Sequence, residues 1–93
     1  MAERVNASHI LLNDQKKANE VLQMIRGGER FADMAKKYSK CPSKKKGGDL
    51  GWFKKGEMVK EFEKAAFGGE KGSVVGPVRT EFGWHLIRIN DLK

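Results

Sequence analysis

Two stretches of the sequence, one near each end, alternate apolar and polar residues as a half-buried β-strand does. Residues 5–12 read VNASHILL and residues 84–90 read WHLIRIN. Each stretch carries one of the two histidines of the chain, His9 and His85. Because helical segments lie between these stretches, we expect an α+β fold in which the first and last strands are neighbours at the centre of a sheet. The two imidazoles would then meet in one hydrogen-bonded pair.

The segments between the two stretches carry helix and turn signals. Asn13-Asp14 offers a cap for a first helix, and Gly27-Gly28 offers its end. Apolar residues between these points recur at spacings of three and four. The other expected elements are helices over residues 29–38 and 60–67, a short extended segment around Trp52-Phe53, a strand over 74–80 and a turn at 81–83.

The length, net charge and cysteine content limit the kinds of protein that this chain can be. The 93 residues suffice for one hydrophobic core, and we expect residues 1–93 to form a single domain. The net charge of +7 suggests affinity for polyanions or acidic peptide segments. One cysteine, Cys41, excludes an internal disulfide and fits a reducing compartment. The longest apolar run near the N-terminus, residues 10–12, is far too short for a membrane span.

These features predict a soluble, cytoplasmic protein without membrane contact. The prediction assumes that the sequence is the whole protein and not a piece of a longer chain. No long apolar surface stripe is left over, so we expect a monomer.

The histidines and the cysteine are candidates for chemistry. No C-x-x-C or H-x-x-x-H spacing accompanies them, so no metal is expected. A cysteine–histidine protease would also need an oxyanion hole and a nucleophile turn, which the sequence does not show. The spacing Gly47-Gly48…Gly51 is not G-x-G-x-x-G, so no nucleotide cofactor is expected. The residues alone leave open that His9 and His85 only satisfy each other in the interior.

The stretch KKKGGDLGWFKKGEM, residues 44–58, mixes lysines and glycines with two aromatic residues, Trp52 and Phe53. Aromatic rings among lysines are typical of single-stranded nucleic-acid binding. The simpler interpretation is a glycine-rich loop kept in water by its lysines, with the aromatic rings turned inward. We favour the loop, with Trp52 partly exposed.

Four stretches together resemble the parvulin family of peptidyl-prolyl cis/trans isomerases, in family order and over nearly the whole chain. They are ASHILL, FADMAKKYSKCPS, GGDLGWFKKGEMVKEFEKAAF and GPVRTEFGWHLIRI. The resemblance is to the minimal single-domain form, and it implies a four-stranded antiparallel sheet surrounded by helices. It also implies rotamase activity on X–Pro bonds of peptides and unfolded client proteins, which would assist folding without a cofactor.

The resemblance assigns roles to eight residues. The polar, catalytic set would be His9, Cys41, Thr80 and His85, with the two histidines paired beneath the active site and Thr80 in the same hydrogen-bond network. An apolar cup for the proline ring would be formed by Leu50, Met58, Phe62 and Phe82. We expect Cys41 to act as an electrostatic and hydrogen-bonding group facing the substrate carbonyl, with a covalent thiohemiacetal as the alternative.

The chain departs from the phosphate-directed members of this family, which carry a long basic loop after the first strand. Here Leu12 is followed at once by Asn13-Asp14 and a helix. We therefore expect no requirement for a phosphorylated residue before proline, and only a modest preference for acidic flanking residues from Lys44–Lys46. Two other functions stay open: a groove that captures peptides as a chaperone with little catalysis, and nucleic-acid binding.

Overall fold

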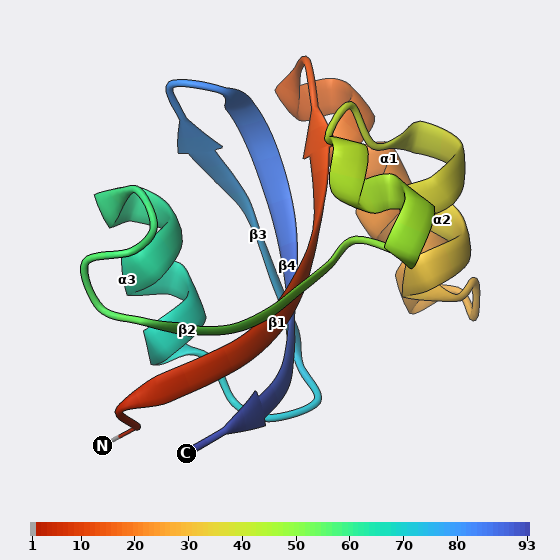
Figure 1. Cartoon of the computed structure of the whole chain (residues 1–93). Coiled ribbons are helices and arrows are strands. Elements are labelled where there is room, and N and C mark those ends of the chain that lie inside the picture. The colour runs from red at the N-terminus through yellow and green to blue at the C-terminus, as the bar shows by residue number, and fades with distance from the viewer. Residues whose placement is uncertain (1) are drawn as a thin grey trace.

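The computed structural model describes residues 2–93 as one four-stranded antiparallel sheet with helices on both of its faces (Figure 1). The strand order is β2-β1-β4-β3, so the first and last strands are central, as the sequence predicts. The elements are β1 (Arg4–Leu12), α1 (Gln15–Arg26), α2 (Phe31–Tyr38), a 3₁₀ helix η1 (Pro42–Lys46), β2 (Asp49–Lys54), α3 (Lys60–Gly68), β3 (Val74–Thr80) and β4 (Gly83–Leu92). The predicted α+β class and sheet are confirmed.

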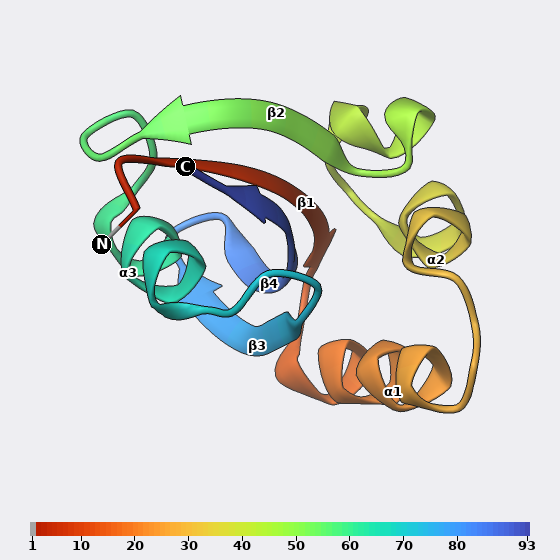
Figure 2. The same ribbon diagram turned by 90° about the horizontal axis from the view of Figure 1, so that it is seen from below.

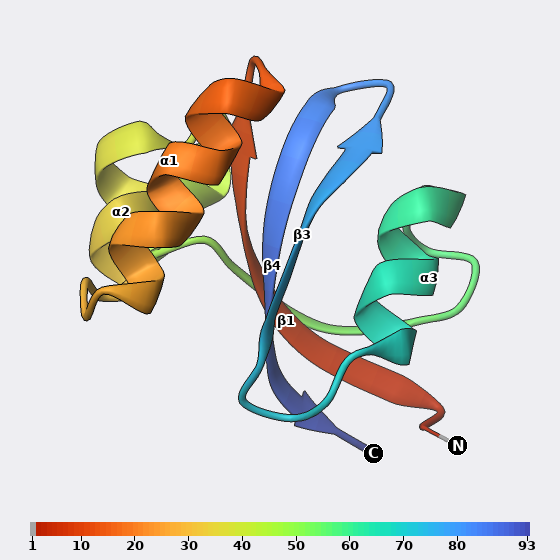
Figure 3. The ribbon, with the colours of Figure 1, turned by 180° about the vertical axis from the view of Figure 1, so that it is seen from behind.

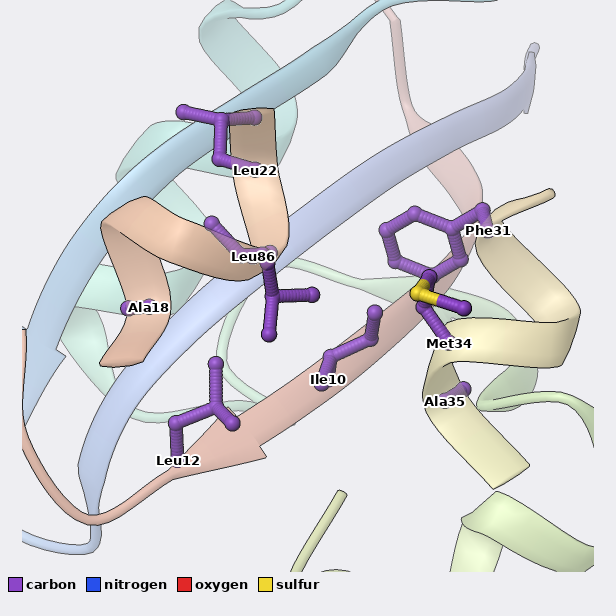
Figure 4. Packing of buried hydrophobic residues seen from close by; sticks show 9 residues of the cluster. Ile10, Leu12, Ala18, Leu22, Phe31, Met34, Ala35 and Leu86 are labelled. Carbon is purple, nitrogen blue, oxygen red and sulfur yellow. The ribbon is translucent and has the colours of Figure 1, made fainter. Parts of the chain in front are cut away.

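The alternation of β1 and β4 divides the interior into two hydrophobic clusters, because successive side chains of a strand point to opposite faces. One face carries Ile10, Leu12 and Leu86 beneath α1 and α2. Figure 4 shows these side chains in one cluster with Phe31 and Met34 of α2, of which Ile10 lies nearest to the two. Figure 3 shows α1 and α2 together on this side of the sheet.

The other face of the sheet packs against α3. This second cluster contains Val5, Ala7, Phe53, Phe62, Ala66, Ile87 and Ile89. Figure 2 shows the sheet curving around α3, so that β2 and β3 lie on either side of it. Both histidines belong to β1 and β4 on this concave face, which therefore holds the candidate site.

Local signals account for the ends of the first helix. Asp14 caps α1 by accepting a hydrogen bond from the backbone N–H of Lys17 at 2.8 Å, as its cap position predicts. At the other end, Gly27 follows the last helical residue and donates its N–H to the Gln23 carbonyl. The short loop of Asn13 and Asp14 fixes α1 directly behind the end of β1.

The structure differs from the expected elements mainly between α2 and β2. Helix α2 begins at Phe31 and not at residue 29, because Arg30 has an extended backbone. The 3₁₀ helix Pro42–Lys46 has no counterpart in the expectations, since a proline, a serine and three lysines carry no apolar period. Strand β2 spans Asp49–Lys54, longer than the segment expected around Trp52-Phe53. The other boundaries differ from the expected ones by at most two residues, and β3 has the expected bounds.

Within residues 2–93, none of the helices combines the length and the apolar character that crossing a bilayer would require.

Candidate active site

His9 of β1 and His85 of β4 are in direct contact. In the β1–β4 register His9 lies opposite Ile87, and Leu11 lies opposite His85, so the two histidines are diagonal neighbours on one face. Their Nδ1 atoms are 3.0 Å apart, and the rings stack with centroids 5.2 Å apart and an interplanar angle of 18°. Both side chains are buried, with exposures of 6% and 4%. The predicted contact is confirmed.

Burial keeps both imidazoles neutral near pH 7. Desolvation, and secondarily the charge that His85 would carry, lower the pKa of His9 to about 4. Burial also lowers the pKa of His85 below its ordinary value. One proton therefore lies between the two Nδ1 atoms, so that one ring donates and the other accepts.

Thr80 extends this contact toward the β3–β4 turn. Its Oγ1 lies 2.7 Å from Nε2 of His85 and accepts the backbone N–H of Phe82 at 3.2 Å. The tautomer of His85 decides whether this hydroxyl donates to Nε2 or accepts from it, and in either case one proton lies between the two Nδ1 atoms. A continuous chain of hydrogen bonds thus joins the histidine pair to the turn that holds Phe82.

A largely apolar groove of about 510 Å³ opens above the histidine pair. All four residues predicted for the proline cup line it, namely Leu50, Met58, Phe62 and Phe82. Phe62 is a fixed wall, 3% exposed and edge-on to both imidazoles, whereas Phe82 is 63% exposed at the rim. The arrangement suits an apolar ring held above a polar floor.

The predicted polar set is only partly in the groove. His9, Cys41 and His85 line it, whereas Thr80 lies behind His85. Sequence reasoning missed five other lining residues: Leu11, Lys40, Pro42, Glu57 and Val59. Each is next in sequence, or next but one, to a residue that was predicted, so their proximity in the chain was the available signal.

Cys41 sits at the start of η1, where its backbone and not its thiol is anchored. Its N–H donates to Oγ of Ser39 at 3.3 Å, and the same oxygen accepts the N–H of Leu11 at 3.0 Å. Among residues 2–93, no hydrogen bond joins the thiol to His9 or His85. Activation of a cysteine nucleophile requires a base within such reach. The geometry therefore favours the electrostatic role over the covalent one.

Gly48 ties the loop after η1 to the strand that carries His9. The Gly48 carbonyl accepts the N–H of His9 at 2.9 Å, and the Gly48 N–H donates to the Ser43 carbonyl at 2.9 Å. Its φ of +87° favours glycine, and an added Cβ would collide with the His9 carbonyl oxygen. The glycine-rich stretch is thus anchored to the strand that carries His9, and its Leu50, Glu57 and Met58 line the groove.

The two aromatic residues and the lysines of that stretch face the core or water, not the groove. Phe53 is 2% exposed and packs against Phe62, while Trp52 is 39% exposed, with the Lys93 ammonium 5.0 Å from its ring centre. Lys44–Lys46 are exposed, and none of them lines the groove. The lysines are exposed as expected, but residues 49–54 form strand β2 and not a loop. Trp52 alone of the two aromatic residues is available to a base.

Metal chemistry has no visible basis in the described part of the chain. In residues 2–93, no three His, Cys, Asp or Glu side chains gather as a metal ion would need.

The sequence of this chain is similar to those of known proteins along nearly its whole length. The model of the PPIC-type PPIase domain matches residues 1–93. The foldase protein PrsA of Geobacillus kaustophilus is 49% identical over 89 residues, which are 95% of this chain and 32% of the relative. The chain thus spans about a third of the length of the curated relatives it matches.

Solved structures of a larger protein and of a small one both superpose on this chain. The crystal structure of PrsA from Bacillus subtilis superposes with a TM-score of 0.93 at 47% identity, covering 96% of this chain and 35% of that one. The solution structure of NmPin, the parvulin of Nitrosopumilus maritimus, gives 0.86 at 41% identity and covers 96% of this chain and 97% of that one. The second match accounts for nearly all of a small parvulin. The chain belongs to the parvulin family of PPIC-type peptidyl-prolyl cis/trans isomerases.

Proposed function

We propose that this chain accelerates the cis/trans isomerisation of X–Pro bonds in unphosphorylated peptide segments and so assists the folding of client proteins. The observation that carries this proposal is the apolar groove, lined by all four predicted cup residues, above a neutral histidine pair. The relatives named foldases support the client class. A cytoplasmic location and a monomeric state stay predictions from the sequence.

The reaction requires no covalent chemistry from the protein. Rotation about an X–Pro bond is opposed by amide resonance, with a barrier of roughly 18–20 kcal/mol, and no bond has to break. A thousandfold acceleration needs only about 4 kcal/mol of preferential binding of the twisted amide. Selective binding of the twisted form is therefore sufficient chemistry.

The groove supplies such preference in two ways. Met58, Phe62 and Leu50 offer apolar surface to the pyrrolidine ring and exclude water from the bond. Exclusion of water disfavours the planar amide, which is the more polar form. The buried pair of His9 and His85 holds the floor rigid. Cys41 also lines the groove, and its proposed role is electrostatic, toward the substrate carbonyl.

The absence of a phosphate requirement is inferred from the loop after β1. Only Asn13 and Asp14 separate β1 from α1, so the chain has no long basic loop at that point. Phosphorylated and unphosphorylated substrates would then both be turned over.

A nuclear magnetic resonance exchange assay on a panel of X–Pro peptides tests the proposal. Met58→Ala should lower kcat/KM by about tenfold, because it removes roughly 1–2 kcal/mol of apolar contact with the ring. Met24→Ala is the matched control, since Met24 is also partly buried but packs against the α1–α2 cluster on the other face. It should leave kcat/KM unchanged.

Two results would contradict the proposal. Peptide binding without acceleration by the wild-type chain would make the groove a capture module, as in the chaperone alternative. Equal losses in the Met58 and Met24 variants would place catalysis elsewhere.

A further inference from the structure

Strand β1 extends beyond its partner β2 at the end that carries the histidine. The β1–β2 register stops at Ser8, opposite Asp49, whereas β1 continues to Leu12. Backbone N–H and C=O groups along that edge of β1 therefore need other partners. The segment that connects α2 to β2 supplies them.

Two hydrogen bonds fix this segment to Leu11. The Leu11 N–H donates to Oγ of Ser39 at 3.0 Å, and the Leu11 carbonyl accepts the N–H of Lys40 at 2.8 Å. Leu11 lines the groove and lies opposite His85 in the β1–β4 register. The segment is therefore held directly beside the strand that carries His9 at the floor of the site.

The hydroxyl oxygen of Ser39 also accepts the N–H of Cys41, at 3.3 Å. A serine hydroxyl has two acceptor positions, so the N–H groups of Leu11 and Cys41 together fill both of them. Ser39 is 3% exposed, so bulk water does not reach this oxygen to take its place. One buried atom thus links β1 to the backbone of Cys41.

Helix α2 fixes the position of that oxygen. Ser39 is the C-cap of α2, with an extended backbone, and its N–H donates to the Ala35 carbonyl at 3.0 Å. Ala35 is fully buried in the cluster that packs α2 against Ile10 of β1. The link therefore rests on the packed body of the protein and does not depend on the lysine-rich turn that follows.

Cys41 has no other hydrogen-bonded link to β1 within residues 2–93. Its carbonyl accepts the N–H of Lys44 of η1 at 3.0 Å, and its thiol bonds to neither histidine. The effect of a polar group on a carbonyl depends on their separation, and a misplacement of about 1 Å can cost a factor of about 100 in rate. The position of Cys41 above the histidine floor therefore depends on Ser39.

We propose that Ser39 is a positioning residue of the isomerase, whose buried oxygen holds Cys41 at its working distance from the substrate carbonyl. The proposal rests on the proposed isomerase function and adds a residue to it. Ser39 does not line the groove, so it acts through Cys41 and not on the substrate. Its removal should therefore slow the reaction without weakening peptide binding.

A cycle of four proteins tests this role: the wild type, Ser39→Ala, Cys41→Ala and the double variant. In the exchange assay Ser39→Ala should lower kcat by about 3- to 10-fold and change KM by less than about twofold, because an interaction made only in the transition state is weakened. In the Cys41→Ala background the same change should alter kcat by less than about twofold, since no polar group is left to position. Ser39→Thr keeps the oxygen and should retain most of the wild-type kcat.

Ser43→Ala is the matched control, because it makes the same chemical change in the same connecting segment. The Ser43 oxygen is buried but has no hydrogen-bond partner among residues 2–93, and Ser43 does not line the groove. Its kcat and KM should equal those of the wild type. Amide hydrogen exchange gives a local measurement: the amides of Leu11 and Cys41 should exchange about tenfold faster or more in Ser39→Ala, and at the wild-type rate in Ser43→Ala.

Equal losses of kcat for Ser39→Ala in the two backgrounds would overturn the proposal, because Ser39 would then support the fold and not Cys41. Wild-type kcat in Ser39→Ala, or no loss in Cys41→Ala, would overturn it as well. Ser39→Cys, with a weaker acceptor, repeats the cycle if Ser39→Ala does not fold, and the same outcomes decide. If the wild-type chain accelerates no peptide at all, the isomerase function itself fails and this role fails with it.

Discussion

Nδ1 of His9 and Nδ1 of His85 lie 3.0 Å apart across the two central strands, although 76 positions separate the residues in sequence. Both atoms are buried, and neither ring is protonated on both nitrogens near pH 7. Each histidine is therefore the hydrogen-bond partner that the other needs in a place without water. This mutual dependence joins the first and last strands directly below the groove.

The two single histidine variants should together lose more unfolding free energy than the double variant loses. His9→Leu or His85→Leu leaves a buried ring nitrogen without a partner, at about 1–3 kcal/mol of unfolding free energy each. The double variant His9→Leu with His85→Leu leaves neither nitrogen, so its loss should fall short of the sum of the single losses by about 1–2 kcal/mol. Urea denaturation of the four proteins measures this coupling. Additive losses would show that the contact contributes nothing to stability.

The lowered pKa of His9 predicts a loss of stability in mild acid. In the unfolded chain His9 takes up a proton near its ordinary pKa of 6.5, and in the folded protein only near 4. Between these values unfolding binds a proton, so the free energy of unfolding falls as the pH falls. The expected loss between pH 7 and pH 5 is about 2 kcal/mol, and the lowered pKa of His85 acts in the same direction.

Urea denaturation at pH 7, 6 and 5 checks this dependence. The variant His9→Leu with His85→Leu is the control and should lose most of it. The lowered pKa of Asp91 lies below its ordinary 3.8 and so does not interfere in this window. A wild-type stability that stays constant from pH 7 to pH 5 would contradict the prediction.

The sequence predicted the sheet well because its strongest signals are local. Alternation in residues 5–12 and 84–90, the cap at Asp14 and the glycines at 27 and 28 each act within a few residues, and the structure keeps all of them. The 3₁₀ helix Pro42–Lys46 was missed because contacts with distant parts of the chain position it. Its end is fixed by the contact of Gly48 with His9, which no local pattern reveals.

The site could be predicted only residue by residue. The contact of the two histidines was predicted from the strand pattern and the cup residues from a resemblance of motifs, and the structure brings them together. Lys40, which lines the groove, was not predicted, because only the fold shows which of the lysines near Cys41 faces it. Lys44–Lys46 gave the stronger signal in the sequence, yet they lie outside the groove.

Cys41→Asp should keep kcat/KM within about tenfold of the wild type, a change of about 1.4 kcal/mol. The reason is that the thiol forms no hydrogen bond to either histidine among residues 2–93, so it lacks the base that a nucleophile needs. A carboxylate can still act electrostatically on the substrate carbonyl but cannot form a thiohemiacetal. The same exchange assay measures the variant, with Cys41→Ala as the control that removes the polar group. Complete loss of activity in Cys41→Asp alongside a correctly folded chain would restore the covalent role.

Gly48 and Gly51 offer a matched test of how the glycine-rich loop supports His9. Both have positive φ, +87° and +71°, but an added Cβ meets the His9 carbonyl at Gly48 and nothing within 4 Å at Gly51. Gly51→Ala should therefore cost only the backbone strain, about 1–2 kcal/mol. Gly48→Ala adds a steric collision and should cost about 3 kcal/mol or more.

Activity separates the two glycine variants further. Displacement of the Gly48 backbone breaks its 2.9 Å hydrogen bond with the N–H of His9 and shifts the strand that carries His9, so kcat/KM should fall along with stability. Gly51→Ala should change kcat/KM little, because the strain stays within β2 and the added Cβ meets nothing within 4 Å. Urea denaturation and the exchange assay on both variants supply the comparison. Equal losses of stability and activity at the two positions would show that the collision with His9 relaxes without consequence, and that the loop does not fix the floor of the site.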